Sequence, residues 1–356
     1  MIESMDKGNI RFNSVHVERL RGIKSADVQD LSRINIFFGK NNCGKSTLLE
    51  AIFLLSGQSN PTLPVRINKA RGYRDLRNSN DVTIEFYNLD ATQPILIASK
   101  GNDERQLEIS LIRSNSHTVS LNDEGMARSQ MVDAYFGLKL KFSGDKSSEI
   151  VFKEDANQDQ GKIRTDEHYQ ERLDATLMSP RNASIVNDVV GNLAAIIENK
   201  QKEAIISALK TIEPKLEDIM VVGENIMVDI GQEKYLPLQL MGDGMLRILS
   251  TIVHIYGCKN GVILIDEVDN GLHPSVMSQL WQSIFTTAIE NDVQVYVTTH
   301  NIDSIIGLNK VVAENPKYKE LMASYKLIKT ESDEVEAVRY DAKHLDFMIQ
   351  QDIEMR

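Results

Sequence analysis

The amino-acid sequence predicts an α/β fold built around a mostly parallel core sheet. Segments 261–266 and 293–297 are rich in branched apolar residues, with only Asp266 at the end of the first and Gln294 within the second as polar members, as expected for parallel strands covered on both faces. A helical pattern begins between them at Pro274, which is the order of a strand–helix–strand crossover. A third apolar strand, 34–38, runs into a glycine turn and a helical pattern over 44–55. These elements predict the core of the fold.

Two further parts interrupt this core in the sequence. Residues 80–153 contain short apolar runs separated by Asn, Asp, Gly and Ser, which predicts an antiparallel β lobe. Two helical patterns follow, the first capped by Asn187 and the second ended by Pro214, which predicts a helical insertion. The predicted strands of the lobe are 82–86, 95–97, 107–111 and 138–142. The predicted parts of the chain are the N-terminal core (1–60), a basic segment with the β lobe (61–163), the helical insertion (164–220) and the C-terminal core (221–356).

Composition excludes several classes of protein. The chain has 356 residues, a net charge of −11 and two cysteines. The length allows two lobes with substantial cores, and the acidic balance argues against a surface that coats nucleic acid. Two distant cysteines do not make a disulfide framework or a zinc site. The polar start is no signal peptide and no apolar run is long enough to span a membrane, so we expect a cytoplasmic location.

The segment Gly-Lys-Asn-Asn-Cys-Gly-Lys-Ser-Thr at 39–47 matches the pattern G-x-x-x-x-G-K-[ST], between a predicted strand and a predicted helix. In this context backbone N–H groups and the helix N-terminus surround a polyphosphate. Lys45 is expected to reach the β- and γ-phosphates, and Ser46 to bind Mg²⁺. The predicted nucleotide-binding residues of the loop are Gly39, Asn41, Asn42, Gly44, Lys45, Ser46 and Thr47.

Two of the buried strands end in polar residues that belong at the same edge of the sheet. Asp266 ends the first run, where it can hold Mg²⁺ through water. Glu267 follows directly and is placed to act as the general base for an attacking water. His300 ends the next strand, so it should emerge at the same carboxyl edge and contact the γ-phosphate. A structural or solvated histidine is the alternative for His300.

A second candidate anion site lies at Gly242-Asp243-Gly244, where a glycine turn begins a predicted helix. A helix N-terminus with exposed amides attracts anions. Since the nucleotide loop is already present elsewhere, this turn is expected to dock onto nucleotide held by another copy of the chain.

In this order, the motifs resemble the ABC-like ATPase heads of the SMC, RecF and OLD proteins, especially the small AAA-type members abundant in bacterial phage-defence operons. Segment 15–55 is similar to the family's first strands and Walker A motif, and segment 238–249 to its signature. Segment 262–274 is similar to the Walker B motif and the D-loop that follows it, and segment 298–301 to the switch histidine. The middle of the chain, about 60–215, carries no matching motif.

The resemblance implies a P-loop NTPase of the ABC-ATPase head type that binds ATP and Mg²⁺ and hydrolyses the ATP. It also implies a homodimer or larger homo-oligomer, in which two ATP molecules are sandwiched between loop 39–47 of one copy and the turn 242–244 of the other. Asp269 corresponds to the D-loop at this composite site, and His300 to the switch residue.

The chain departs from the family pattern in two places. The signature usually has serine where this chain has Gly242, so a hydroxyl contact to the γ-phosphate is missing and we expect slow turnover. No motif identifies a Q-loop glutamine, and Gln58 and Gln93 are candidates only by exclusion.

Partners are predicted from two further features. OLD-type relatives carry a Toprim nuclease with an Asp-x-Asp pair, which this chain lacks, so we expect a separately encoded effector, a nuclease or a toxin. A basic segment follows the Walker A helix, and it could contact nucleic acid, dock an acidic partner or be a solvated face. Its residues are Arg66, Lys69, Arg71, Arg74 and Arg77.

Three functions fit these features to different degrees. The favoured one is an ATPase whose pairing regulates an effector in antiviral defence. The alternative is a RecF- or SMC-like ATPase of DNA repair or chromosome maintenance that binds DNA directly. A GTPase switch is opposed, because the segment 309–312 lacks the Asp that would pair with guanine.

Overall fold

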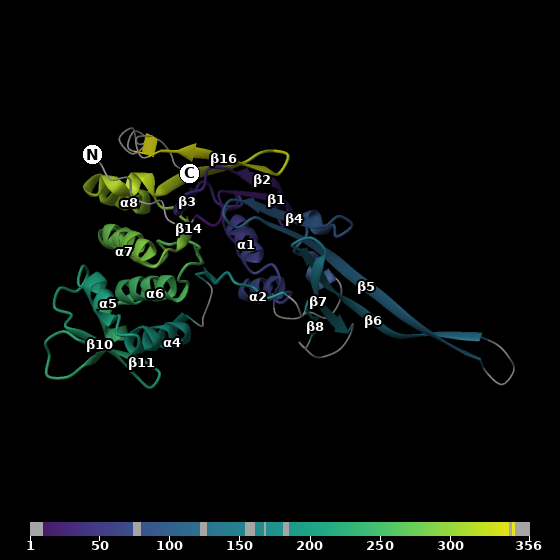
Figure 1. The fold of residues 1–356 in the computed structure, drawn as a ribbon, viewed down its shortest axis with the longest axis horizontal. Helices are drawn as coiled ribbons and strands as arrows, with labels where there is room; N and C mark the ends of the chain where they lie inside the picture. Colours follow the sequence, from purple (N-terminus) through teal and green to yellow (C-terminus); the bar gives the residue numbers. More distant parts are fainter. Residues whose placement is uncertain are drawn as a thin grey trace.

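One large sheet and the helices on its two faces organise the molecule (Figure 1). The computed structural model describes residues 10–73, 80–121, 127–153, 161–166, 169–180, 185–341 and 344–345. The strands of the large sheet are β1 (Ser14–Leu20), β2 (Ile23–Val28), β3 (Ile34–Phe38), β4 (Ile95–Lys100), β5 (Arg105–Leu121), β6 (Ala127–Phe142), β7 (Lys146–Lys153), β8 (Lys162–Arg164), β9 (Ala175–Met178), β13 (Val262–Ile265), β14 (Gln294–Thr298), β15 (Met322–Lys329) and β16 (Glu334–Tyr340). Their order is β8-β7-β6-β5-β4-β1-β2-β16-β15-β3-β14-β13-β9.

The parallel core lies at one end of this sheet. The neighbouring pairs β15–β3, β3–β14, β14–β13 and β13–β9 are all parallel, and every residue of β3, β13 and β14 is buried. Continuous apolar strands of this kind need cover on both faces. The predicted parallel core is therefore confirmed. It also contains β9, a strand that lies in the part of the sequence predicted to be the helical insertion (164–220).

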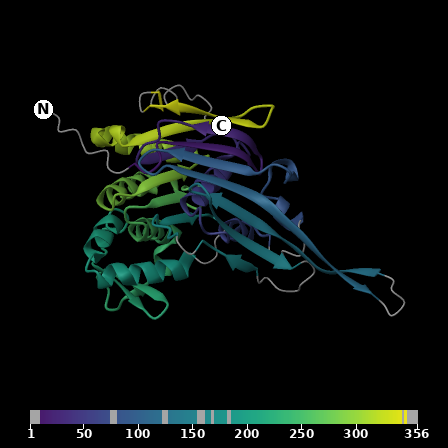
Figure 2. The ribbon, with the colours of Figure 1, turned by 45° about the vertical axis from the view of Figure 1, so that its right-hand side comes forward.

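Helices cover the two faces of the core (Figures 1 and 2). Side chains alternate along each strand: Phe37 packs in one core cluster with residues of α1, whereas Ile36 packs in another with residues of α6, α7 and α8. The helices are α1 (Lys45–Ser56), α2 (Leu63–Ala70), α3 (Asn80–Thr83), α4 (Ile185–Glu198), α5 (Lys202–Leu209), α6 (Asp243–Gly257), α7 (Met277–Glu290) and α8 (Ile302–Glu314).

The antiparallel β lobe is present, and it continues the core sheet rather than forming a sheet of its own. It joins the core where β2 pairs in parallel with β16, and it extends through antiparallel pairs from β2 to β8. Strands β5 and β6 are 17 and 16 residues long. Together they form a ribbon that projects from the body of the molecule in both views (Figures 1 and 2).

Two local predictions were wrong. The expected strand 82–86 begins inside helix α3, and only Phe86 makes an isolated bridge with Leu20. Val82 and Phe86 are both buried, and their spacing of four suits a helical turn as well as a strand. Asn187 does not cap α4, because the helix already begins at Ile185.

The predicted helical insertion is formed by α4 and α5, which pack on α6 through buried residues such as Leu193 and Leu209. A small sheet of β10 (Asp218–Val222), β11 (Asn225–Asp229) and β12 (Leu236–Pro237) lies beside them. Among the described residues, no helix combines the length and apolar character needed to cross a membrane.

Candidate functional site

The loop between β3 and α1 has the backbone that the glycines predict. Gly39 has φ +143°, and a Cβ there would lie 2.6 Å from the carbonyl oxygen of Leu327 on β15. Gly44 has φ +100°, and a Cβ there would press against Ile23 and Val335 at 3.3 Å. Such φ values are readily adopted only by glycine. The loop is therefore fixed by close packing against the neighbouring strands.

Lys45 lies inside the curve of this loop. Its side chain is buried, and its Nζ donates hydrogen bonds to the carbonyl oxygens of Gly39 at 2.9 Å and Lys40 at 2.8 Å. The ammonium group is thus held where the loop closes, next to the N-terminus of α1. This is the position from which a lysine can contact a phosphate bound by the loop.

The Walker B aspartate meets the loop at the end of β13. Ser46 Oγ donates to Asp266 Oδ1 at 3.0 Å, and Thr298 Oγ1, at the end of β14, donates to the same oxygen at 2.6 Å. Thr298 Oγ1 also accepts a hydrogen bond from the backbone N–H of Glu267 at 2.8 Å. Residues far apart in the sequence therefore converge at one carboxylate, because β3, β14 and β13 are neighbours in the sheet.

Glu267 and Asp269 lie around the side chain of Arg247, a residue that the sequence analysis missed. Glu267 has φ +49°, a left-handed conformation that is costly for this residue type. Arg247 donates from Nη2 to the Glu267 carbonyl at 3.3 Å. Burial lowers the pKa of Arg247, while the charges of Asp269, Glu267 and Asp266 oppose that shift. The arginine is thus the cation that faces this group of carboxylates.

Asp269 is itself buried, and its Oδ1 has no hydrogen-bond partner among the described residues. A buried polar atom of this kind usually signals a missing partner or a functional role. For Arg247, the one signal in the sequence that could have linked this residue to the site is its position in the first turns of α6.

The signature turn begins α6 and faces solvent. Gly242 has φ +86° and is exposed together with Asp243, and a Cβ on Gly244 would lie 3.7 Å from Leu272 of the D-loop. None of the hydrogen bonds between described residues joins this turn to the loop 39–47. The structure therefore places the signature next to the D-loop of the same chain, not next to its nucleotide loop.

His300 lies at the predicted edge of the sheet. Its neighbour Thr299 is buried and donates its backbone N–H to the carbonyl of Phe37, which precedes the nucleotide loop by two residues. Asn301 caps α8 by accepting from the N–H of Asp303 at 2.9 Å. The imidazole of His300 is exposed between these two fixed points.

Of the two glutamines proposed for the Q-loop, Gln58 lies away from this site. Gln58 is beyond the C-terminus of α1 and donates to Ser143 Oγ at 3.2 Å and Tyr169 Oη at 2.9 Å. A helix of 12 residues is about 18 Å long, so the side chain of Gln58 is far from Ser46 at the other end. Gln93 is exposed in the turn before β4.

Within the basic segment, Arg71 forms an ion pair inside the chain, which the sequence did not predict. This side chain pairs with Glu50 of α1 at 2.6 Å, and Glu50 also pairs with Arg21 at 3.0 Å. Arg21 in turn contacts Glu85 at 2.9 Å. Burial raises the pKa of Glu85 to about 7, and the charge of Arg21 opposes that shift.

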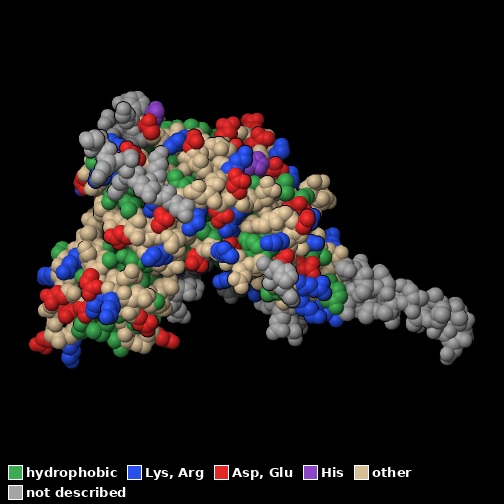
Figure 3. Space-filling model, viewed as in Figure 1, with side chains coloured by type: hydrophobic (Ala, Val, Ile, Leu, Met, Phe, Trp, Pro, Cys, Tyr) green, Lys and Arg blue, Asp and Glu red, His purple; other side chains and the backbone are tan. Residues whose placement is uncertain are grey.

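Arg71 therefore belongs to a charge cluster within the chain, in which its partly exposed side chain is paired with the buried carboxylate of Glu50. Arg66 and Lys69 are exposed on α2, whereas Arg74 and Arg77 lie outside the described residues. On the side of the molecule drawn in Figure 3, acidic and basic side chains are interspersed over the coloured part of the surface.

Comparison with known proteins agrees with this geometry. A family model described as "AAA ATPase domain" matches residues 11–171, and one described as "AAA domain, putative AbiEii toxin, Type IV TA system" matches residues 183–306. A protein of Helicobacter pylori named "ATP/GTP phosphatase" is 26% identical over 335 residues, which cover 85% of this chain and 89% of that protein. The DNA replication and repair protein RecF of Shewanella piezotolerans is 27% identical over 118 residues, 33% of this chain and 28% of RecF.

Among solved structures, an SMC head bound to the C-winged helix domain of ScpA gives a TM-score of 0.48 at 11% identity, and the match covers 93% of this chain and 97% of that one. The SMC head domain of Thermotoga maritima gives a TM-score of 0.48 with this chain at 9% identity. That match covers 93% of this chain and 100% of the SMC head domain. The two ATPase-domain matches, the relative matched over most of its length and the convergence of the loop with Asp266 indicate an ATP-hydrolysing enzyme that is similar to AAA-type ATPases and, over part of the chain, to RecF.

Proposed function

We propose that ATP and Mg²⁺ bind at the loop 39–47 and that two copies of the chain close on the nucleotide. The observation that carries this proposal is the shared Asp266 oxygen, which accepts from Ser46 at 3.0 Å and from Thr298 at 2.6 Å. A hydroxyl and a carboxylate oxygen at this spacing are ligand types that Mg²⁺ prefers. Ser46 and Asp266 would hold the ion, directly and through water. The bound ion would neutralise charge on the β- and γ-phosphates.

In this proposal Glu267 is the general base. It would accept a proton from the water that attacks the γ-phosphorus, so that the bond to the ADP oxygen breaks and ADP and phosphate leave. Its carboxylate lies directly after the Mg²⁺ ligand, and its backbone is held by Thr298 and Arg247. His300 would contact the γ-phosphate from the neighbouring strand end.

The second half of each site would come from another copy. Gly242, Asp243 and Gly244 present the exposed N-terminus of α6, a 15-residue helix, and such an end attracts the γ-phosphate of a nucleotide. Asp269 would face the same phosphate through the D-loop.

Exposed apolar residues lie close in the chain to two of these parts: Leu240 is 70% exposed before the signature turn, and Ile302 and Ile306 are 39% and 44% exposed on α8, after His300. If a second copy of the chain packs here, these three apolar side chains would be removed from water.

Light scattering after size exclusion tests the pairing. Glu267→Gln should bind ATP, lose most hydrolysis and elute with at least twice the monomer mass only when ATP and Mg²⁺ are present. Lys45→Ala, which should not bind ATP, is the control. A Glu267→Gln protein that hydrolyses ATP at the wild-type rate, or that stays monomeric with bound ATP, would contradict the proposal.

We further propose that this cycle regulates a separate effector in antiviral defence. The support is the model matched by residues 183–306, whose description names a toxin of a toxin–antitoxin system. A plaque assay tests this role: cells that carry the gene and its neighbours should lose protection when the chain carries Lys45→Ala. Equal protection by the wild type and the variant would contradict an ATP-dependent defence role.

A further inference from the structure

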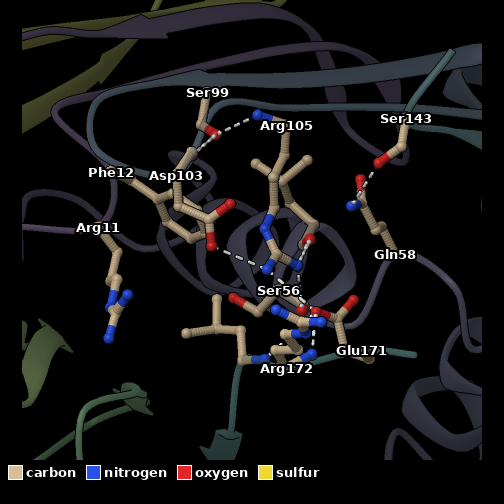
Figure 4. A network of polar contacts seen from close by, with 12 residues as sticks. Arg11, Phe12, Ser56, Gln58, Ser99, Asp103, Arg105, Ser143, Glu171 and Arg172 are labelled. Carbon is tan, nitrogen blue, oxygen red and sulfur yellow. Dashed lines mark hydrogen bonds and ion pairs between the residues drawn. The ribbon is translucent and has the colours of Figure 1, made fainter. Parts of the chain in front are cut away.

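Arg105 is buried where the projecting ribbon meets the Walker A helix. It is 6% exposed and begins β5. Its guanidinium donates to the carbonyl oxygens of Ser56 at 2.6 Å and Leu55 at 3.3 Å, and it pairs with the carboxylates of Asp103 at 2.8 Å and Glu171 at 3.0 Å (Figure 4). One side chain therefore joins the ribbon, α1 and the segment before β9.

Arg105 contacts α1 at its C-terminus, the end of a helix that a positive charge stabilises. The last carbonyls of a helix lack donors within the helix and carry the negative end of its dipole. Ser56 is the last residue of α1, so Arg105 satisfies carbonyls that would otherwise be buried without partners. The opposite end of the same helix forms the nucleotide loop.

The contact with Glu171 leads to the other half of the site. Glu171 Oε1 also accepts from the backbone N–H groups of Arg172 at 3.0 Å and Leu173 at 3.3 Å, and so fixes the turn into β9. Strand β9 pairs in parallel with β13, and the backbone N–H of Asp266 donates to Met178, the last residue of β9. Arg105 is therefore linked to Lys45 through α1, and to Asp266 through Glu171, β9 and β13.

The ribbon is supported by neighbouring strands only near its root. Its root is held by β4, which pairs with Arg105 to Ile109, and by β7, which pairs with Tyr135 to Phe142. Farther out, the pairs from Asn115↔Ala134 to Leu121↔Ala127 have no third strand among the described strands. A two-stranded ribbon is only marginally stable alone, so its outer part is free to respond to whatever contacts it.

We propose that Arg105 is a positioning residue that couples the β5–β6 ribbon to the ATP site. Binding of ATP at the N-terminus of α1 alters the ribbon root through Arg105, and by reciprocity a partner that fixes the ribbon alters the affinity for ATP. The inference rests on the proposed nucleotide site.

The chain offers a matched control for this arginine. Arg33 is also 6% exposed and donates to the last carbonyls of a helix, Ala288 at 3.3 Å and Ile289 at 3.5 Å, and to the carboxylate of Asp292 at 2.9 Å. Its helix is α7, which carries no nucleotide ligand. Arg105→Gln and Arg33→Gln therefore remove the same chemistry, but only Arg105→Gln should affect the ATP site.

Hydrogen exchange of the full-length protein with and without ATP and Mg²⁺ tests the coupling, beside a titration of ATP affinity. In the wild type and in Arg33→Gln, ATP should slow exchange of the amides at 107–111 and 138–142. In Arg105→Gln this difference should disappear, and the Kd for ATP should rise about five-fold, the lower end of typical couplings. Arg105→Lys, which keeps the charge, should show an intermediate response and serves if the Gln variant does not fold.

Two results would overturn the inference: an ATP-dependent change at the ribbon root that persists in Arg105→Gln and Arg105→Lys, or an equal loss in Arg33→Gln. A wild-type protein that binds no ATP would instead contradict the proposed nucleotide site, so the two failures are distinguishable.

Discussion

Thr298 donates a hydrogen bond of 2.6 Å to the same Asp266 oxygen that accepts from Ser46. The hydroxyl of Thr298 also accepts the backbone N–H of Glu267. This one side chain therefore orients the aspartate and the glutamate of the site together. Partners of this kind hold metal-binding carboxylates in position and affect activity nearly as strongly as the ligands.

Replacement of Thr298 by valine should lower kcat for ATP hydrolysis by about 10- to 100-fold. Valine has nearly the same shape but leaves the N–H of Glu267 without its acceptor and Asp266 without one of its donors. Thr298→Ser keeps the hydroxyl and should retain most activity. Steady-state ATPase assays of the two variants provide the comparison, and equal kcat values would show that the hydroxyl is not needed.

Arg247 should be required for the same step. Arg247→Met keeps the length of the side chain but removes the cation that faces Asp266, Glu267 and Asp269, leaving their repulsion uncompensated. We expect kcat to fall at least 10-fold, with a smaller loss for Arg247→Lys, which keeps the charge. If Arg247→Met lowered only the thermal stability, with kcat unchanged in the folded protein, its role would be limited to packing.

The sequence predicts those parts of the candidate site that lie within one continuous segment. The loop 39–47 and the pair Asp266–Glu267 are recognisable because their spacing and the adjoining apolar strands are local features. Thr298 was missed as a site residue because its role depends on β14 lying next to β13. Arg247 was missed because its role depends on the contact between α6 and the residues after β13, and neither arrangement is encoded in local spacing. The same holds for Arg71, whose partner Glu50 is 21 residues away on another helix.

The core was predictable for a related reason. Fully buried strands such as β13, VILI, and the centre of β14, VYV, are apolar runs, which few other structures require. Strand β9 has only four residues, three of them partly exposed, so it lacks that signal. The projecting ribbon was also underestimated, since its outer part has no apolar face in the sequence that would mark two strands of such length.

Arg71 and Arg66 should respond differently to the same substitution. Arg71→Ala leaves Glu50, which is 8% exposed, with one cation fewer, and removing a partner from a buried pair is costly. We expect a loss of about 2 kcal/mol in the free energy of unfolding. Arg66→Ala changes an exposed side chain of α2 and should stay within about 0.5 kcal/mol. Urea denaturation measures both, and similar losses would contradict the internal role of Arg71.

Glu85 should make the stability of the protein depend on pH. Burial raises its pKa from 4.5 to about 7 in the folded state, whereas the unfolded chain keeps an ordinary carboxyl pKa. The folded state therefore binds the proton more tightly, so this contribution to stability is fully present below about pH 4.5 and is lost as the pH rises through about 7. Glu85→Gln, which stays neutral, should remove this part of the dependence. Urea denaturation of both proteins at pH 5 and pH 8 should show a larger decrease for the wild type, and identical decreases would mean that Glu85 remains ionised in the fold at both values.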